Sequence, residues 1–404
     1  MTHRSDNKSF EQVLEVLIEN GLDGMASALE VILNEAMKLE RSSFLGAGPH
    51  ERTPERRGYS NGFKDKTVRS RIGELSLKIP QVRDLQGSEG FYPKSLEKGL
   101  RSERALKLAL AEMYVQGVST RRVKEITRQL CGLEVSSTDV SRATKLLDEE
   151  LQAWRSRPIG KVPYLILDAR YEKVRHGGSV RDCSVLIAVG VREDGKRTIL
   201  GVSVSLSEAE VHWRDFIESL QERGMYGVKV VTSDDHMGLK AARQARLTGA
   251  HWIRCQCHLQ RNAQKYVPTK DMRQEVASAI RSVFNASDLK EAEDRLSRMV
   301  QAYSKKAPAL SAWAEKNIPE GLTVFKLPDS HRRRMRTTNC VERINEEVKR
   351  RTRVARLFPN EESLLRLVSA VLSEISDEWE TGKRYLNMEA EWPSEDQIYR
   401  KAVA

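Results

Sequence analysis

The sequence TTNCVERINEEVKRRTR, residues 337–353, decides how the rest of the chain is interpreted. Apolar residues in and just after it recur at the spacing of a helix, and they are Val341, Ile344, Val348 and Ala355. A neighbouring stripe is polar, and it consists of Glu342, Asn345, Glu346, Lys349 and Arg353. Thr338 or Asn339 can cap the N-terminus of this helix through a side-chain oxygen. The stretch therefore predicts a helix with one carboxylate beside its apolar face and basic residues along the following turns.

This helix and its flanks carry most of the net charge of the chain. Between His331 and Arg356 there are ten lysine and arginine residues and three glutamates, a net charge of +7. The whole chain of 404 residues has a net charge of +11, and its isoelectric point is about 9.4. Such a concentration indicates a polyanionic partner, with nucleic acid the first choice and an anionic membrane surface the second. Taken alone, the segment also fits a solvated basic helix.

The bulk composition indicates a folded, helix-rich protein with room for two to four domains, since 39% of the residues are hydrophobic and only 12 are proline. We find no apolar run of about 18 residues, so no membrane span is expected. The N-terminal residues lead into a charged amphipathic stretch and not into the apolar core of a signal peptide. The five scattered cysteines are typical of a reducing cytoplasm and not of a disulfide framework.

The N-terminal third is predicted to be helical, with one hairpin. Residues 1–60 form a helical region in which two amphipathic helices meet at Asn20-Gly21. Residues 61–100 form a hairpin and linker, because apolar residues alternate on both sides of Gly73-Glu74. The hairpin is interpreted either as an arm that contacts DNA or as an ordinary surface hairpin.

Residues 101–155 show the pattern of a helix-turn-helix domain, in which short helices are joined by glycine turns and serine or threonine caps. The expected helices are Arg104–Gln116, a second that begins at Ser119 or Thr120 and ends at Gly132, and a third over Thr138–Trp154 that is capped by Ser136 or Ser137. The third helix would present Arg142 and Lys145 to DNA. An ordinary three-helix bundle is the alternative.

From residue 160 the pattern changes to alternating strands and helices. Five strands are expected, at Tyr164–Leu167, Cys183–Val191, Thr198–Val204, Val228–Thr232 and Ala250–Cys255. Helices separate the last three strands, so the order is βββαβαβ, which is that of a ribonuclease-H-like α/β core. We assign residues 160–258 to the first part of this core, 259–335 to an all-helical insertion, 336–390 to the second part with the Glu342 helix, and 391–404 to a tail.

Three carboxylates mark the candidate site. Asp168 follows the apolar run of the first strand, and Asp234 follows the fourth strand in the same way. The first and fourth strands are neighbours in this fold, so the two carboxylates can approach each other. Glu342, on a helix over the sheet, would complete the set. Asp235 competes with Asp234 for the second position.

Three clustered carboxylates repel one another and stay ionised together only when cations lie among them. Oxygen ligands of this kind select Mg²⁺, for which Mn²⁺ can substitute, and two such ions serve phosphoryl transfer on nucleic acids. Basic and polar residues on the same helix would then hold DNA phosphates, and they are Arg343, Asn345, Lys349, Arg350 and Arg353.

Cys255-Gln-Cys-His258 has two possible interpretations. A structural zinc site requires four ligands, usually in two pairs, and the sequence offers no second pair. We therefore favour a buried thiol and a hydrogen-bonded histidine that support the active site. Trp252 is interpreted as a core aromatic residue in preference to a base-stacking one.

The chain resembles bacterial transposases of the IS256 group, which are related to the eukaryotic Mutator transposases. The resemblance rests on residues 164–175, 230–239, 255–262 and 337–353, with 73–80 near the N-terminus, and together these span nearly the full length. It implies a DDE transposase on a ribonuclease-H-like fold with a helical insertion. It also implies that Asp168, Asp234 and Glu342 are the catalytic triad and that Cys255 and His258 match the Cys-x-x-His element of the family.

The resulting expectation is a Mg²⁺-dependent transposase that binds the terminal inverted repeats of an insertion sequence, cuts a DNA strand and joins it to another. We expect double-stranded DNA as the partner, a homodimer on that DNA, and a cytoplasmic, nucleoid-associated location in a bacterium. A structure-selective nuclease on the same fold would cut without joining. A non-catalytic DNA-binding regulator would tolerate the loss of any carboxylate, and the three intact carboxylates argue against it.

Overall fold

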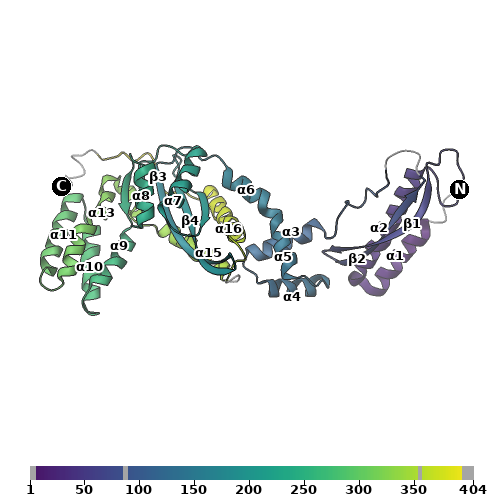
Figure 1. The fold of residues 1–404 in the computed structure, drawn as a ribbon, viewed down its shortest axis with the longest axis horizontal. Helices are drawn as coiled ribbons and strands as arrows, with labels where there is room; N and C mark the ends of the chain where they lie inside the picture. Colours follow the sequence, from purple (N-terminus) through teal and green to yellow (C-terminus); the bar gives the residue numbers. More distant parts are fainter. Residues whose placement is uncertain (1–5, 85–89, 354–356, 394–404) are drawn as a thin grey trace. The chain divides into compact units, whose positions relative to one another are not determined.

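The computed structural model describes residues 6–84, 90–353 and 357–393 (Figure 1). The chain divides into two compact units, Met1–Leu147 and Asp148–Ala404. The finer division that the sequence suggests stays a prediction. Within the described ranges, none of the helices is long and apolar enough to cross a membrane. The expected mixture of helices and strands is confirmed, and the predicted positions of Ala355, Arg356 and most of the tail lie outside the described residues.

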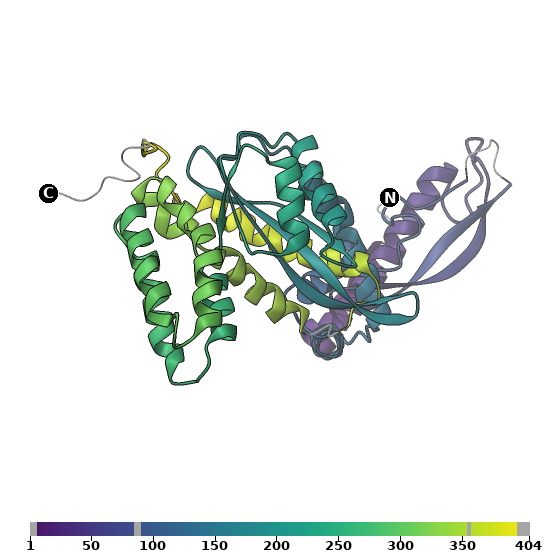
Figure 2. The ribbon, with the colours of Figure 1, turned by 60° about the vertical axis from the view of Figure 1, so that its left-hand side comes forward.

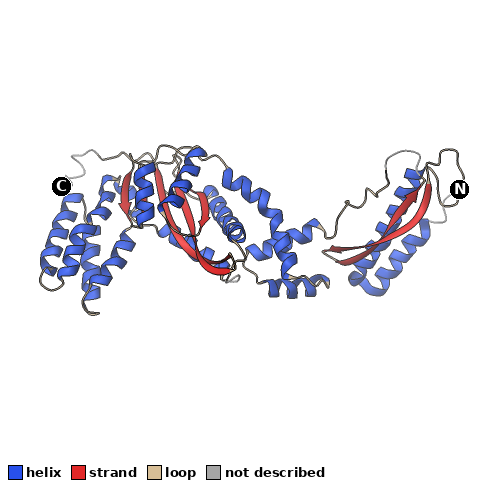
Figure 3. Ribbon diagram, viewed as in Figure 1, coloured by secondary structure: helices blue, strands red, loops and turns tan. Residues whose placement is uncertain are grey.

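The first unit begins with two helices and a hairpin, coloured by structure type in Figure 3. The elements are α1 (Asp6–Asn20), a short 3₁₀ turn (Gly21–Gly24), α2 (Met25–Leu45), β1 (Tyr59–Ser70) and β2 (Gly73–Arg83). The antiparallel hairpin is confirmed and is longer than the alternating pattern indicated. Helix α2 packs on β2 around a core of alternate strand residues and helix residues, which includes Met37, Val68, Leu75, Leu77 and Ile79.

Three short helices complete the first unit: α3 (Arg104–Val115), α4 (Thr120–Cys131) and α5 (Ser137–Thr144). The Ser119 side chain caps α4, and Gly132 ends it in the left-handed conformation that glycine adopts readily. Ser136 caps α5 in a reciprocal arrangement with Asp139. The predicted continuous helix over Thr138–Trp154 is wrong. A 3₁₀ turn at Lys145–Leu147 interrupts it, and α6 (Asp148–Ser156) belongs to the second unit.

The second unit is built on a mixed five-stranded sheet. Its strands are β3 (Tyr164–His176), β4 (Ser179–Val191), β5 (Arg197–Ser205), β6 (Val230–Ser233) and β7 (His251–Arg254), in the spatial order β5-β4-β3-β6-β7. β3, β4 and β5 pair antiparallel, whereas β3, β6 and β7 pair parallel. The expectation that the first and fourth strands are neighbours is therefore confirmed.

Helices cover both faces of this sheet (Figures 1 and 2). On one face α7 (Glu210–Glu222) and α8 (Met237–Arg246) bury a core that contains Leu165, Leu167 and Trp213. Strand side chains alternate between faces, so Tyr164 and Ile166 point to the other side. There the Tyr164 hydroxyl lies 2.6 Å from Nδ1 of buried His331, on α14 (Asp329–Met335). Helices α15 (Asn339–Thr352) and α16 (Glu361–Thr381) also contact β3.

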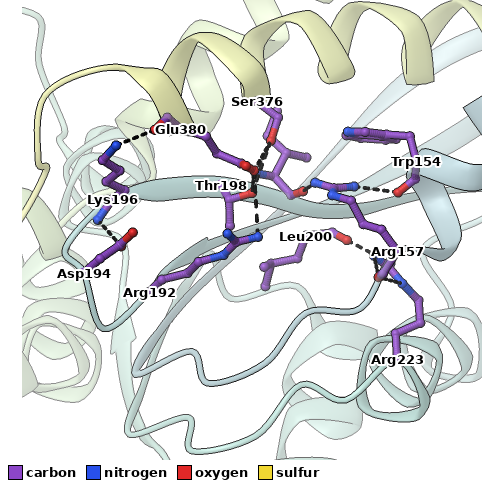
Figure 4. A network of polar contacts seen from close by, with 11 residues as sticks. Trp154, Arg157, Arg192, Asp194, Lys196, Thr198, Leu200, Arg223, Ser376 and Glu380 are labelled. Carbon is purple, nitrogen blue, oxygen red and sulfur yellow. Dashed lines mark hydrogen bonds and ion pairs between the residues drawn. The ribbon is translucent and has the colours of Figure 1, made fainter.

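Helix α16 also holds the edge strand β5 (Figure 4). The Ser376 hydroxyl accepts a hydrogen bond from the Ile199 backbone N–H at 3.2 Å, and the Thr198 hydroxyl donates to the Glu380 carboxylate at 2.5 Å. Two arginines from outside the strand also bind β5. Arg157 donates to the carbonyl oxygen of Ile199 at 2.6 Å, and Arg223 donates to that of Leu200 at 2.8 Å. An exposed sheet edge can pair with another chain, and these contacts protect this one.

Every element between β7 and α15 is helical, a stretch that the structure describes without a gap. The elements are α9 (Gln256–Ala263), a 3₁₀ turn (Gln264–Tyr266), α10 (Met272–Phe284), α11 (Leu289–Tyr303), α12 (Pro308–Asn317), α13 (Pro319–Leu322), a second 3₁₀ turn (Thr323–Lys326) and α14 (Asp329–Met335). After α16 the chain returns to the sheet, where Trp392 stacks on Tyr164 at a centroid distance of 5.8 Å. Residues 394–404 of the expected tail lie outside the described residues.

Candidate active site

Asp168 lies where two of the sheet pairings diverge. The parallel ladder between β3 and β6 ends with the pair Ile166 and Thr232, whereas β3 itself continues to His176 paired with β4. The predicted end of the first strand at Leu167 is therefore wrong, because pairing with β4 extends the strand to His176. Asp168 shares its face of the sheet with Ile166, two residues earlier. The carboxylate thus projects just beyond the end of β6.

The Asp168 carboxyl group is buried, with 7% of the residue exposed, and its Oδ1 accepts a hydrogen bond from the Ala169 N–H at 2.9 Å. Burial, reinforced by the negative charge of Asp234, raises the pKa of Asp168 to about 7. The first two predicted carboxylates therefore act on each other electrostatically, because Asp168 lies on β3 and Asp234 directly follows its neighbour β6. A carboxyl group with so high a pKa needs a compensating cation to stay charged at neutral pH.

Asp234 and Asp235 have different surroundings. Asp235 forms ion pairs with Lys240 at 3.3 Å and with Arg254 at 3.1 Å. Arg254 is 4% exposed and also pairs with Glu320 at 2.8 Å, so Asp235 belongs to a neutralised cluster that joins the sheet to α13. Asp234 is half-buried, and its Oδ1 accepts a hydrogen bond from the His236 N–H at 3.3 Å. Of the two candidates, Asp234 is the one that acts on Asp168.

Glu342 lies in the first turn of α15, and its nearest cation comes from the helical stretch after β7. Arg261, on α9, places Nη1 at 3.1 Å from the Glu342 Oε1. That oxygen is buried, and it accepts no hydrogen bond from any residue that the structure describes. Among the described residues no three histidine, cysteine or acidic side chains are gathered closely enough to hold a metal ion. The structure therefore brings Asp168 and Asp234 together and leaves Glu342 paired with Arg261.

Cys255 and His258 connect β7 to the start of α15. The Cys255 sulfur is buried and accepts hydrogen bonds from both the backbone N–H and the hydroxyl of Thr338, each at 3.4 Å. The predicted side-chain cap by Thr338 or Asn339 is wrong: Thr338 occupies the N-cap position, but it makes no capping bond and its hydroxyl is turned to the sulfur. A hydrogen bond with Cys257 lowers the pKa of Cys255, and the hydrogen bond with Cys255 raises the pKa of His258. The positive charge of His258 interacts electrostatically with Asp168 and Asp234, and it lowers the pKa of Asp168.

Glu208 is a further acidic residue near Asp234, and the sequence did not predict it. Glu208, between β5 and α7, is 9% exposed, and its Oε2 lies 3.3 Å from the Nδ1 of His236. Burial raises the pKa of Glu208, and the charge of Asp234 adds to this effect. The sequence around Glu208 has no signal that could identify it, because only the fold brings this loop to the end of β6. Trp252 is half-buried and lies outside the core that the sequence predicted for it, and the cationic groups of Lys240 and Arg243 lie over its ring at 4.8 and 4.9 Å.

The predicted DNA-contacting residues in and just after α15 differ in solvent exposure and in their hydrogen bonds within the protein. Arg343, Lys349 and Arg353 are exposed, as is Arg350, whose guanidinium donates two hydrogen bonds to Glu347 at 2.7 and 2.9 Å. Asn345 is half-buried, and its buried side-chain oxygen has no hydrogen-bond partner within the described part of the chain. In the first unit Arg142 and Lys145 are both exposed, on α5 and on the 3₁₀ turn that follows it.

Comparisons with known proteins identify the family. The model of the family described as "Transposase, Mutator family" matches residues 1–382. The transposase for insertion sequence element IS406 of Burkholderia multivorans is 56% identical over 389 residues, which cover 96% of this chain and 99% of that protein. The transposase for IS256 in transposon Tn4001 of Staphylococcus aureus is 33% identical over 389 residues, 95% of this chain and 97% of that protein.

A solved structure described as a crystal structure of NurA overlaps 60% of this chain at 14% identity and a TM-score of 0.12, which is too weak to bear on the fold. The transposase of element ISRM5 from Rhizobium meliloti is 43% identical over 393 residues, 96% of each chain. The resemblance read from the sequence motifs is thus confirmed over nearly the full length, and the chain belongs to the Mutator family of transposases.

Proposed function

We propose that this protein is the DNA transposase of an insertion sequence and that Asp168, Asp234 and Glu342 form its catalytic centre. The observation that carries the proposal is the buried Asp168 carboxylate, whose pKa is raised to about 7 by burial and by Asp234. Strongly shifted pKa values of this kind concentrate at functional sites. Membership of the transposase family supports the same assignment.

The donor set fits Mg²⁺ or Mn²⁺. Asp168 and Asp234 supply carboxylate oxygens, which these ions prefer, and the buried Oε1 of Glu342 lacks a hydrogen-bond donor. Bound there, up to two such ions would supply Lewis-acid chemistry to a DNA phosphodiester. The proposal requires Glu342 to exchange its ion pair with Arg261 for this role.

Other residues of the site would bind DNA phosphates and hold the catalytic carboxylates in position. Lys349 and Arg353 are exposed along α15 beyond Glu342, where they would hold phosphates that flank the reacting one. His258, with a raised pKa, keeps a positive charge near Asp168 and Asp234 and lowers their mutual repulsion. Thr338 and Cys255 fix the first turn of α15 relative to the end of β7, which sets the position of Glu342.

For the whole protein we propose a ribonuclease-H-like core, with β3, β4 and β5 antiparallel and β6 and β7 parallel in support. Helices α3 to α5 would act as a helix-turn-helix that recognises terminal inverted repeats through Arg142 and Lys145. Two element ends must be joined, so we expect a homodimer on DNA, at the bacterial nucleoid in the cytoplasm.

Asp168→Asn tests the proposal, because it removes a charge from the site and leaves the exposed basic surfaces in place. The variant should lose cleavage of end DNA in Mg²⁺ by about 10⁴-fold or more, as on removal of one catalytic residue, and keep its affinity for that DNA. The matched control is Asp182→Asn, an exposed aspartate on β4 that should cut like the wild type. A strand-transfer assay with a pre-cut end then separates a transposase from a nuclease. Cleavage by Asp168→Asn at the wild-type rate would refute the assignment.

A further inference from the structure

A polar cavity lies where the helices that follow β7 meet the start of α15. It has a volume of about 250 Å³ and is lined by residues of α9, α10, α14 and the start of α15. Three arginines line it, Arg281, Arg333 and Arg336, and none of its ten lining residues is acidic. In a chain with 57 acidic residues, a cavity with three guanidinium groups and no carboxylate indicates an anionic ligand.

The polar groups of this cavity are partly fixed in place. The Arg336 Nη1 donates to the Asn285 side-chain oxygen at 2.8 Å, and the Arg281 Nη2 donates to the Ser278 hydroxyl at 3.0 Å. Both arginines keep further N–H donors beyond these bonds, since a guanidinium has five. Arg281 and Arg333 are exposed, so their charged ends reach solvent at the mouth of the cavity. Preorganised guanidinium groups are well suited to the oxygens of a phosphate.

The cavity adjoins the Glu342 carboxylate on two helices. Asn339 lines it and lies one turn before Glu342 on α15. Cys257 also lines it, donates to the Asn339 side-chain oxygen at 3.3 Å, and lies one turn before Arg261 on α9. Arg261 in turn pairs with Glu342 at 3.1 Å. Two of the lining residues are thus each about one helical turn from a member of the Glu342–Arg261 ion pair.

We infer that this cavity binds a backbone phosphate of the DNA strand that passes the catalytic centre. The inference rests on the proposed function, because it takes DNA as the substrate. A polyanion is favoured over a free phosphate ion because the cavity is continuous in sequence with the basic residues of α15, within the segment 331–356 that carries a net charge of +7. A DNA strand can neutralise both regions at once, whereas a single small anion cannot.

The salt dependence of DNA binding tests this inference. The full-length chain is titrated with a fluorescent duplex of arbitrary sequence that has a single-stranded extension, over a range of salt concentrations. Each lost phosphate contact lowers the slope of log K against log salt concentration by about 0.7–0.9. The double variant R281Q/R333Q should show a smaller slope than the wild type. Asn285→Asp, which places a carboxylate in the cavity, should bind DNA more weakly than the wild type at low salt.

Matched controls lie on the same helix but outside the cavity. They are Arg273→Gln and Gln274→Glu, which change the charge at exposed positions of α10. Smaller slopes in the cavity variants, with both controls at the wild-type slope, support the inference whether or not the wild type cuts DNA. Equal slopes in cavity variants and controls overturn it, even where the wild type is fully active. Thermal stabilisation of the wild type by inorganic phosphate that R281Q/R333Q lacks, with unchanged DNA slopes, would assign the cavity to a free anion and also overturn it.

Discussion

At the scale of single residues, the second unit contains two buried ionisable groups that differ in whether ion pairs within the protein neutralise them. Arg254 is 4% exposed and forms ion pairs with Asp235 and Glu320, so its charge is compensated within the protein. Asp168 is 7% exposed and faces a second carboxylate, and the nearest cationic influence on it is His258. A buried charge that the protein does not neutralise by itself is costly, and such a cost is retained where a ligand supplies the missing charge.

The sequence could not separate Asp234 from Asp235. Both follow the same strand, and the distinction depends on Arg254 from β7 and Glu320 from α13, which lie far away in the sequence. Asp168 could be predicted because a charged residue directly after four apolar residues is conspicuous. Its exact surroundings could not, because they depend on where the β3–β6 pairing ends.

Glu347 permits a prediction about acid stability. Hydrogen bonds from Arg350, and then from Arg351, lower the pKa of Glu347 from 4.5 to about 2, and Arg351 also pairs with Glu374 of α16 at 2.7 Å. Because the folded-state pKa is lowered, the stabilisation is complete above pH 4.5 and is lost as the pH falls toward 2. Glu347→Gln should therefore cost about 1 kcal/mol of unfolding free energy at neutral pH, since the pair is partly exposed, and nothing near pH 2.

Urea unfolding of wild type and Glu347→Gln at several pH values measures this difference. Glu346→Gln, at the exposed neighbouring position on α15, is the matched control and should keep the acid-dependent loss. A difference between wild type and Glu347→Gln that stays constant from neutral pH to acid would show that the ion pairs to Arg350 and Arg351 do not stabilise the fold.

At the scale of elements, the periodic patterns predicted which elements exist better than where they end. The five strands of the second unit and their neighbours agree with the alternating pattern. The end of β3 was misplaced because its outer half is polar and is held by hydrogen bonds to β4, which no local pattern shows. The predicted helix over Thr138–Trp154 was misread because α5 and α6 have continuous helical spacing, although a 3₁₀ turn separates them at the border of the two units.

The cap of α5 yields a prediction for the first unit. The Ser136 hydroxyl accepts a hydrogen bond from the Asp139 N–H at 3.1 Å, and the Asp139 carboxylate accepts one from the Ser136 N–H at 3.0 Å. Ser136→Ala should therefore lower the thermal stability of the first unit by about 1 kcal/mol. Ser137→Ala is the matched control, because Ser137 is the exposed first residue of the helix and alanine favours helix.

Differential scanning calorimetry of the full-length chain resolves the comparison. The transition of the first unit should move to lower temperature in Ser136→Ala and stay in place in Ser137→Ala. Equal shifts in the two variants would mean that the capping interaction contributes nothing and that only the loss of a serine matters.

At the scale of the whole molecule, the sequence indicated that distant carboxylates belong to one site. In the structure Asp168 lies on β3 and Asp234 directly follows its neighbour β6, where the charge of Asp234 raises the pKa of Asp168, but Glu342 stays paired with Arg261. The order of the strands was enough to predict that Asp168 and Asp234 lie on and directly after neighbouring strands. The long gap before Glu342 was enough to predict the helical stretch between β7 and α15. The position of α9, α10 and α14 around the start of α15 was not predictable, because their periodicity identifies an apolar face but not the surface it covers. Arg261 and the arginine-lined cavity were missed for that reason.

The central claim is that Asp168, Asp234 and Glu342 form one metal-binding catalytic centre on DNA. The most direct measurement is anomalous diffraction at the manganese edge from crystals of the full-length chain with end DNA and Mn²⁺. We expect a manganese peak with carboxylate oxygens of Asp168 and Asp234 at ligand distance, about 2.1 Å, and with Glu342 released from Arg261 and directed to the same site. A manganese peak elsewhere, or a Glu342 carboxylate still paired with Arg261 and out of ligand distance while DNA is bound, would contradict it.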